Sequence, residues 1–225
     1  MCSRFAYLGL SEAIASELDM PDLPEVESRY NIAPTDPVPT VRINSSGKKE
    51  FAILKWGLIP SWSRTPKVSF ATINAKSEEI EQKPSFREAF AQGRRCLILT
   101  DGFFEWLDAP GGKQPYFFRM KSRKTFCMAG LWETWKGGSE TVESCTILTV
   151  PANDLVARVH AKKRMPALFS DRDPMNEWIH FETGSVRAHE LLTPYPEALM
   201  ESYPVAKKMG NVRYALADSI VPMEG

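Results

Sequence analysis

The chain has 225 residues, 43% hydrophobic and 25% charged, which is typical of one soluble globular domain spanning residues 1–225. Lysine plus arginine and aspartate plus glutamate both number 28, so the net charge is zero and no global field draws the protein to nucleic acid or membranes. The four cysteines are widely spaced without a CxxC pair, which argues against a zinc site or redox motif.

The chain does not open with a signal peptide, and no apolar stretch approaches the ~18 residues of a membrane helix. We therefore expect a cytoplasmic monomer, associated with the nucleoid if the source is bacterial. Neither a metal nor an organic cofactor is expected.

The first half of the chain mixes helix, loop and strand signals. Residues 11–18 predict a short amphipathic helix with Ser11 as its N-cap. The proline-rich segment 21–39 predicts an extended loop. A strand is expected over Glu50–Trp56 and a helix over Pro84–Gln92.

Closely spaced strand signals follow, separated by glycine-containing turns. These strands are expected at 95–100, 103–107, 115–120, 125–132 and 145–150. Helices are expected near 153–160 and over 174–181 and 185–192. The order predicts an α+β fold: a mostly antiparallel curled sheet or open β-barrel with flanking helices.

Cys2 directly follows Met1, and cells generally remove Met1 when a small residue comes next. Removal would leave an α-amine and a thiol on one residue, a pair that condenses with aldehydes to a thiazolidine ring. The amine titrates near pH ~7.7–8.0 and a free thiol near ~8.5, so both nucleophiles are expected to be available near neutrality. A small residue at a frayed terminus is the plain alternative.

Three polar residues are candidate partners for this nucleophile. Glu105 lies in an aromatic strand segment, where lost hydration would raise its pKa towards neutrality; strand alternation leaves open that it faces solvent. His160 precedes a basic run whose cations would keep the imidazole neutral, although it could merely be solvated. Asn74 sits between a strand and a helix start, where asparagine is also a common turn residue.

Clusters of lysine and arginine occur near tryptophans, at Arg94–Arg95, Arg119–Lys124, Lys162–Arg164 and Lys207–Lys208. Cations beside stacking rings suit single-stranded nucleic acid. The same clusters are also common on solvated surfaces.

Taken together, several sequence strings resemble the SRAP (SOS-response-associated peptidase) family, in the order of the family. These strings are Met1–Phe5, Arg29–Pro34, Trp56–Trp62, Ile73–Glu78, Arg95–Leu97, Asp101–Trp106, Ala129–Glu133, and His160 with Arg164–Pro166. They span roughly the first three quarters of the chain. Ser3 and Lys76 stand where the family usually has Gly and Arg, and His160 is further from Arg164 than is common.

The resemblance implies a protein that processes abasic sites in single-stranded DNA. Mature Cys2 would form a thiazolidine with the ring-opened sugar, shielding the lesion, with minor lyase activity and release of Met1 as the "peptidase" step. The resemblance further implies that Asn74 holds the sugar, Glu105 acts in acid–base steps and His160 assists ring opening. The residues implied to contact DNA are Arg4, Trp62, Lys76 and Arg164.

Two other functions remain open from the sequence. The first is an N-terminal-nucleophile amidohydrolase or glutamine amidotransferase using Cys2, although the glycine-rich strand typical of such enzymes is missing after Cys2. The second is a non-catalytic reader of single-stranded DNA in which Cys2 is incidental.

Overall fold

The protein is described by a computed structural model that covers residues 2–9 and 12–223. Its strands are β1 Phe5–Tyr7, β2 Arg29–Ile32, β3 Pro37–Ile43, β4 Lys49–Trp56, β5 Asn74–Lys76, β6 Arg95–Thr100, β7 Gly102–Ala109, β8 Gly112–Met120, β9 Phe126–Gly137, β10 Glu140–Pro151, β11 Arg164–Pro166, β12 Leu168–Phe169 and β13 Met200–Pro204. The α-helices are α1 Glu12–Glu17, α2 Arg87–Ala91, α3 Asp154–Ala157, α4 Arg172–Ile179 and α5 Ser185–Leu191. This arrangement is α+β, as the sequence predicts.

The larger sheet closes on itself. Its strands run in the order β11-β10-β4-β3-β6-β9-β12, and β9 also pairs with β10, so β10, β4, β3, β6 and β9 form a barrel. Most pairings are antiparallel, but β10 runs parallel to both β4 and β5. Every residue of β6 is buried, because the core fills one face and α4 covers the other, where Trp178 Nε1 donates to the Cys96 carbonyl at 3.0 Å.

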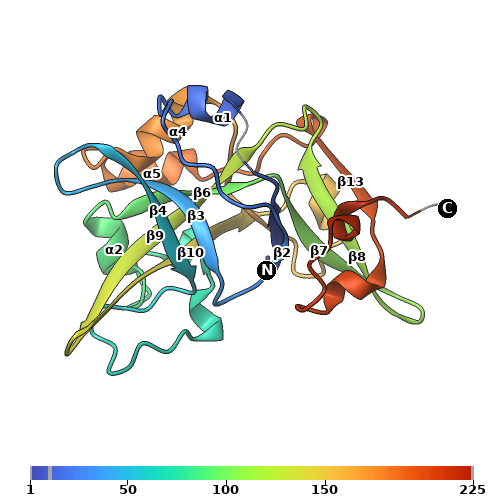
Figure 1. Cartoon of the computed structure of the whole chain (residues 1–225), viewed down its shortest axis with the longest axis horizontal. Helices are drawn as coiled ribbons and strands as arrows, with labels where there is room; N and C mark the ends of the chain where they lie inside the picture. Colours follow the sequence, from blue (N-terminus) through green and yellow to red (C-terminus); the bar gives the residue numbers. More distant parts are fainter. Residues whose placement is uncertain (1, 10–11, 224–225) are drawn as a thin grey trace.

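The second sheet, in the order β13-β8-β7-β1-β2, lies beside the barrel (Figure 1). Strand β1 pairs with β7 through Phe5 opposite Phe103, and the Phe5 ring also meets Trp56 of the barrel at a centroid distance of 5.2 Å. Strand β1 is therefore anchored where the two sheets meet. Among the described residues, no helix is both long and apolar enough to span a bilayer.

The central strands and the late helices agree with the sequence predictions, usually with longer strands. The segment 21–39 is not a continuous loop, because β2 and the start of β3 occur within it. The helix expected from Pro84 begins only at Arg87, after a turn. The predicted N-cap Ser11 lies outside the described residues.

Candidate active site

Cys2 is fully buried where the two sheets meet, just before β1. Its carbonyl accepts a hydrogen bond from Asn74 Nδ2 at 2.7 Å, and its thiol donates to the Arg4 carbonyl at 3.4 Å. Asn74 opens β5, which parallel pairing with β10 holds in the barrel wall, with Ile147 opposite Asn74. An amide from the barrel thus fixes the backbone of the proposed nucleophile.

The expectation that a usable fraction of the Cys2 thiol is ionised near neutral pH is wrong for this fold. Burial raises the pKa of the Cys2 thiol well above its ordinary value, and the nearby Glu105 carboxyl raises it further. At neutral pH the sulfur therefore carries its proton. Any reaction at this sulfur needs a base close by.

Glu105 is 2% exposed in the middle of β7. Strand alternation would place one face of β7 in solvent, but that face is covered too, since Phe104 packs with Val205 and Met209 from the C-terminal segment. Burial raises the pKa of Glu105 to about 8, so the carboxyl holds a proton at neutral pH. Its Oε1 is buried without a hydrogen-bond partner among the described residues.

His160 follows the short helix α3, which Asn153 caps by accepting from the Val156 N–H at 3.0 Å. The imidazole Nε2 lies 3.5 Å from Glu105 Oε2, and Nδ1 accepts from the Arg164 backbone N–H at 3.1 Å. Because Nδ1 is an acceptor, the neutral ring carries its proton on Nε2, facing Glu105. Burial, followed by the charges of neighbouring cations, lowers the pKa of His160 to about 4.

The longer spacing between His160 and Arg164 is accommodated by a turn. The Lys163 N–H donates to the His160 carbonyl at 2.8 Å, and Lys163 adopts a positive φ of 48°. Arg164 then enters β11 opposite Pro151 of β10. The additional residues thus do not separate Arg164 from His160, whose ring it contacts through its backbone.

A pocket of about 370 Å³ opens above these groups. Its lining joins the chain start, strand β7 and the turn after α3: Ser3, Arg4, Glu105, Trp106, Asp108, Lys113, His160, Ala161 and Lys162. With Glu105 protonated, its ionised groups are three cations and Asp108. The excess of positive charge in this pocket suits an anionic ligand.

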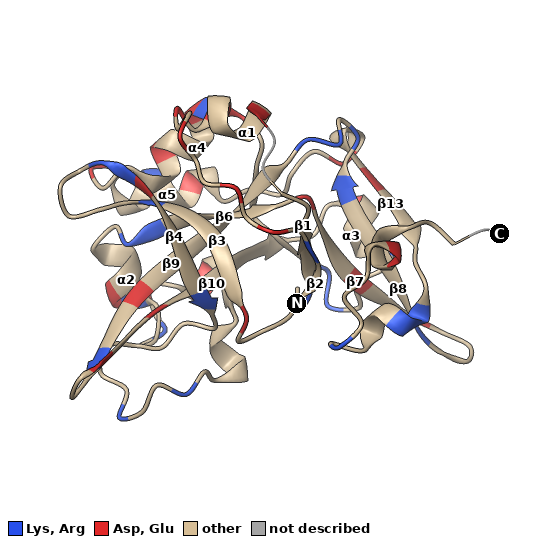
Figure 2. Ribbon diagram, in the orientation of Figure 1, with Lys and Arg blue, Asp and Glu red and all other residues tan. Residues whose placement is uncertain are grey.

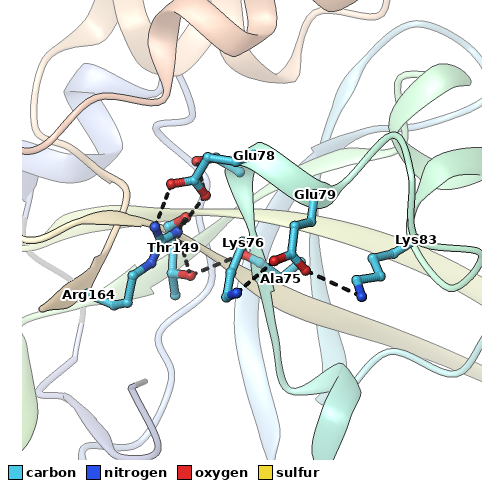
Figure 3. A network of polar contacts seen from close by, with 8 residues as sticks. Ala75, Lys76, Glu78, Glu79, Lys83, Thr149 and Arg164 are labelled. Carbon is cyan, nitrogen blue, oxygen red and sulfur yellow. Dashed lines mark hydrogen bonds and ion pairs between the residues drawn. The ribbon is translucent and has the colours of Figure 1, made fainter. Parts of the chain in front are cut away.

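A second hollow of about 520 Å³ shares Lys162 with this pocket and is also lined by Lys76, Glu78, Glu79 and Arg164. Figure 3 shows how its cations are held: Arg164 forms two hydrogen bonds to the Glu78 carboxylate, and Lys76 pairs with Glu79 at 2.7 Å. Thr149 of β10 lies between them, because β5 and β11 pair with its two sides. The fold therefore brings Lys76 and Arg164 into one hollow next to the pocket.

The other residues expected to contact DNA are placed differently. Arg4 lines the pocket, where its Nη1 donates to the Ser3 carbonyl at 2.6 Å and burial lowers its pKa. Trp62 is 61% exposed on the segment between β4 and β5, which Trp135 anchors by donating to the Ser63 carbonyl at 2.7 Å. Met1 lies outside the described residues, among which no group of His, Cys, Asp and Glu is arranged to hold a metal.

Sequence reasoning missed Lys113. It lines the pocket, and its charge contributes to the lowered pKa of His160, although the two are far apart in the chain. The available signal was Asp108 and Lys113 flanking a glycine turn, since a β-hairpin places these residues opposite one another. Outside the pocket and the hollow, basic and acidic residues are interspersed (Figure 2), so any attraction for an anionic ligand depends on the local grouping of cations.

Comparison with known proteins gives consistent matches. The family profile described as "SOS response associated peptidase (SRAP)" matches residues 1–212. The abasic site processing protein YoqW of Bacillus subtilis (strain 168) is 35% identical over 218 residues, covering 94% of this chain and 95% of that protein. The abasic site processing protein HMCES of Gallus gallus is 30% identical over 203 residues, covering 80% of this chain and 59% of that protein.

Solved structures share the fold. An X-ray structure of a Bacteroides thetaiotaomicron protein matches with a TM-score of 0.84 at 24% identity, covering 99% of this chain and 100% of the other. The X-ray structure of a phage-related protein from Bordetella bronchiseptica matches with a TM-score of 0.72 at 28% identity, covering 96% and 99% of the two chains.

Proposed function

Since this chain belongs to the SOS response associated peptidase family, we propose that it captures abasic sites in single-stranded DNA through Cys2 once Met1 is removed. Relatives similar along most of their length are named abasic site processing proteins. The observation that carries the proposal is the convergence of four residues from segments far apart in the chain. Asn74 binds the Cys2 carbonyl, Glu105 raises the pKa of the Cys2 thiol through its charge, and Glu105 and His160 line one pocket.

The first covalent step joins the Cys2 α-amine to the aldehyde carbon of the ring-opened sugar. The amine nitrogen attacks the carbon and gives a carbinolamine, which must lose its hydroxyl as water to become a protonated imine. Glu105 is suited to donate the required proton, because its raised pKa of about 8 keeps it protonated at neutral pH. Asn74 would hold the Cys2 backbone during this step through its bond to the carbonyl.

Sulfur then adds to the imine carbon and closes the thiazolidine ring. A carbon–sulfur bond forms, the thiol proton passes to the Glu105 carboxylate that the first step left behind, and the C=N electron pair moves onto the nitrogen, which becomes the neutral ring amine. Glu105 therefore acts first as an acid and then as a base, and water is the only product released. Neutral His160, with Nε2–H towards Glu105, stabilises that carboxylate between the two steps.

Ring closure competes with strand cleavage by β-elimination, because both start from the imine. A thiol already seated beside the reacting carbon favours closure, so we propose a protective crosslink with lyase activity as a minor outcome. The DNA strand would run over Arg4, Lys76 and Arg164 with a base stacked on exposed Trp62.

The test uses a single-stranded oligonucleotide with one abasic site, analysed by denaturing gel and intact mass. Wild-type protein lacking Met1 should give a heat-stable adduct. Cys2→Ala keeps the α-amine, so its imine should be trapped only when borohydride is added. Cys127→Ala, which removes a buried barrel thiol, is the matched control and should crosslink like wild type.

An equally heat-stable adduct from Cys2→Ala without borohydride would refute the thiazolidine route. Ammonia release from glutamine would instead support the amidohydrolase reading. Equal affinity for intact and abasic strands, with no covalent product, would support a non-catalytic reader.

A further inference from the structure

The arginine in the hollow already holds an anion. Arg164 Nη1 and Nη2 donate to Glu78 Oε1 and Oε2 at 2.5 and 2.9 Å, so each terminal nitrogen binds one carboxylate oxygen. A DNA phosphate would present two oxygens to the guanidinium in the same side-by-side way. Glu78 therefore occupies the position in which Arg164 would bind phosphate (Figure 3).

The two partners differ in how firmly they are held. The Arg164 side chain is 12% exposed, and its Nη2 also donates to the Thr149 carbonyl at 2.5 Å. The Glu78 side chain is 50% exposed, in the middle of a short 3-10 helix over Ser77–Glu79. When an outside anion competes, the exposed carboxylate can swing into water while the arginine stays bound to β10.

The neighbouring carboxylate Glu79 is also paired with cations. Glu79 is shared by Lys76 at 2.7 Å and Lys83 at 3.5 Å, with all three side chains partly exposed. The hollow is lined by three cations and two carboxylates, so its net charge is only +1 while the pairs persist. Removal of the Glu78 carboxylate from Arg164 would leave a site with much stronger attraction for a polyanionic strand.

We propose that Glu78 is a specificity-determining residue, which competes with DNA phosphate for Arg164 and so weakens binding to undamaged single strands. The proposal rests on the proposed function, since it assumes that a strand enters this hollow. An undamaged strand must displace Glu78 and gains no covalent bond in return. An abasic strand meets the same competition, but its capture at Cys2 makes the bound state lasting.

The experiment measures binding of a fluorescein-labelled oligothymidine strand by anisotropy, in a Cys2→Ala background at several salt concentrations. Glu78→Gln should bind about fivefold more tightly at low salt, because an extra unpaired cation becomes available for one phosphate. The slope of log affinity against log salt should steepen by about 0.7. Glu25→Gln, an equal charge change on the exposed loop before β2 and outside the hollow, should alter affinity less than about twofold.

A double-mutant cycle identifies the cation concerned. In an Arg164→Met background, Glu78→Gln should no longer tighten binding, since no guanidinium remains for Glu78 to occupy. Unchanged binding by Glu78→Gln alone would overturn the proposal, and weaker binding would overturn it in favour of a role for Glu78 in orienting Arg164. Tightening that persists without Arg164 would also overturn it, because the effect would then be one of general charge.

The outcomes separate this inference from the proposed function. Crosslinking of an abasic strand by the Cys2 protein, without tighter binding by Glu78→Gln, refutes the inference and leaves the function standing. Tighter binding by Glu78→Gln, with no adduct from the Cys2 protein, refutes the function and leaves the inference standing.

Discussion

Replacing Glu105 with glutamine should change how the free energy of unfolding depends on pH. Burial raises the pKa of Glu105 from 4.5 to about 8, so the folded protein keeps a proton that the unfolded chain releases. The stability contributed by this proton is fully present below pH 4.5 and is lost as the pH rises through about 8. Glutamine cannot ionise, so Glu105→Gln should escape this loss.

The size of the effect follows from the window in which Glu105 titrates alone. Burial lowers the pKa of His160 from 6.5 to about 4, so that group contributes stability above pH 6.5 that is lost as the pH falls towards 4. Above pH 6.5, of these two groups only Glu105 still changes the free energy of unfolding with pH. Roughly 1.5 pH units up to about 8, at ~1.36 kcal/mol per unit, give about 2 kcal/mol.

The assay is urea unfolding of wild type and Glu105→Gln at about pH 6.5 and 8, with equal m-values required before the free energies are compared. Between these two pH values wild type should lose about 2 kcal/mol relative to the variant. Subtracting the free energy of unfolding of the variant from that of wild type cancels the contributions of groups that titrate in both proteins. A difference that stays constant within ~0.5 kcal/mol would show that Glu105 is ionised in the folded protein, and its proposed role as an acid would fail.

Two further substitutions test the site and the fold. Asn74→Ala removes the hydrogen bond to the Cys2 carbonyl, which is worth about 1–3 kcal/mol in a buried setting. The crosslinking rate should therefore fall about 10–100-fold, and the affinity for the strand should fall less. An equal loss of rate and affinity would contradict a positioning role for Asn74. Gly102→Ala would place a Cβ 2.2 Å from Phe117 Cζ and 2.6 Å from the Phe118 carbonyl oxygen, so urea unfolding should show a loss of about 2–3 kcal/mol. Gly210→Ala, with nothing within 4 Å, is its control, and equal losses would mean that overpacking is not the cause.

The central part of the fold could be predicted from the sequence because its signals are local. Apolar runs such as Arg95–Thr100 are separated by glycine turns, and the hairpins formed as those turns indicate. Strands of three residues, such as β1 and β5, were missed because their apolar pattern is too short to detect. Their existence depends on pairing with β7 and β10, far away in the chain.

The candidate site likewise combines features that local sequence patterns predict with features that depend on residues far apart in the chain. Strand alternation could not decide whether Glu105 faces solvent, because the segment covering the other face of β7 comes about a hundred residues later, at Val205 and Met209. The pairing of Arg164 with Glu78 joins residues separated by 86 positions, so no local pattern reveals it. Residue types and motif order could identify the candidates, whereas their protonation and partners required the three-dimensional arrangement.

The burial of Cys2 also affects how well its thiol would resist oxidation in the cell. Peroxides attack thiolates far faster than thiols, and they need access to the sulfur. A sulfur that is protonated and shielded from water should resist conversion to sulfenic acid, a fate that exposed, acidic cysteines meet readily. Under the proposed function, the Cys2 thiol would thus survive oxidising conditions and stay able to capture an abasic site.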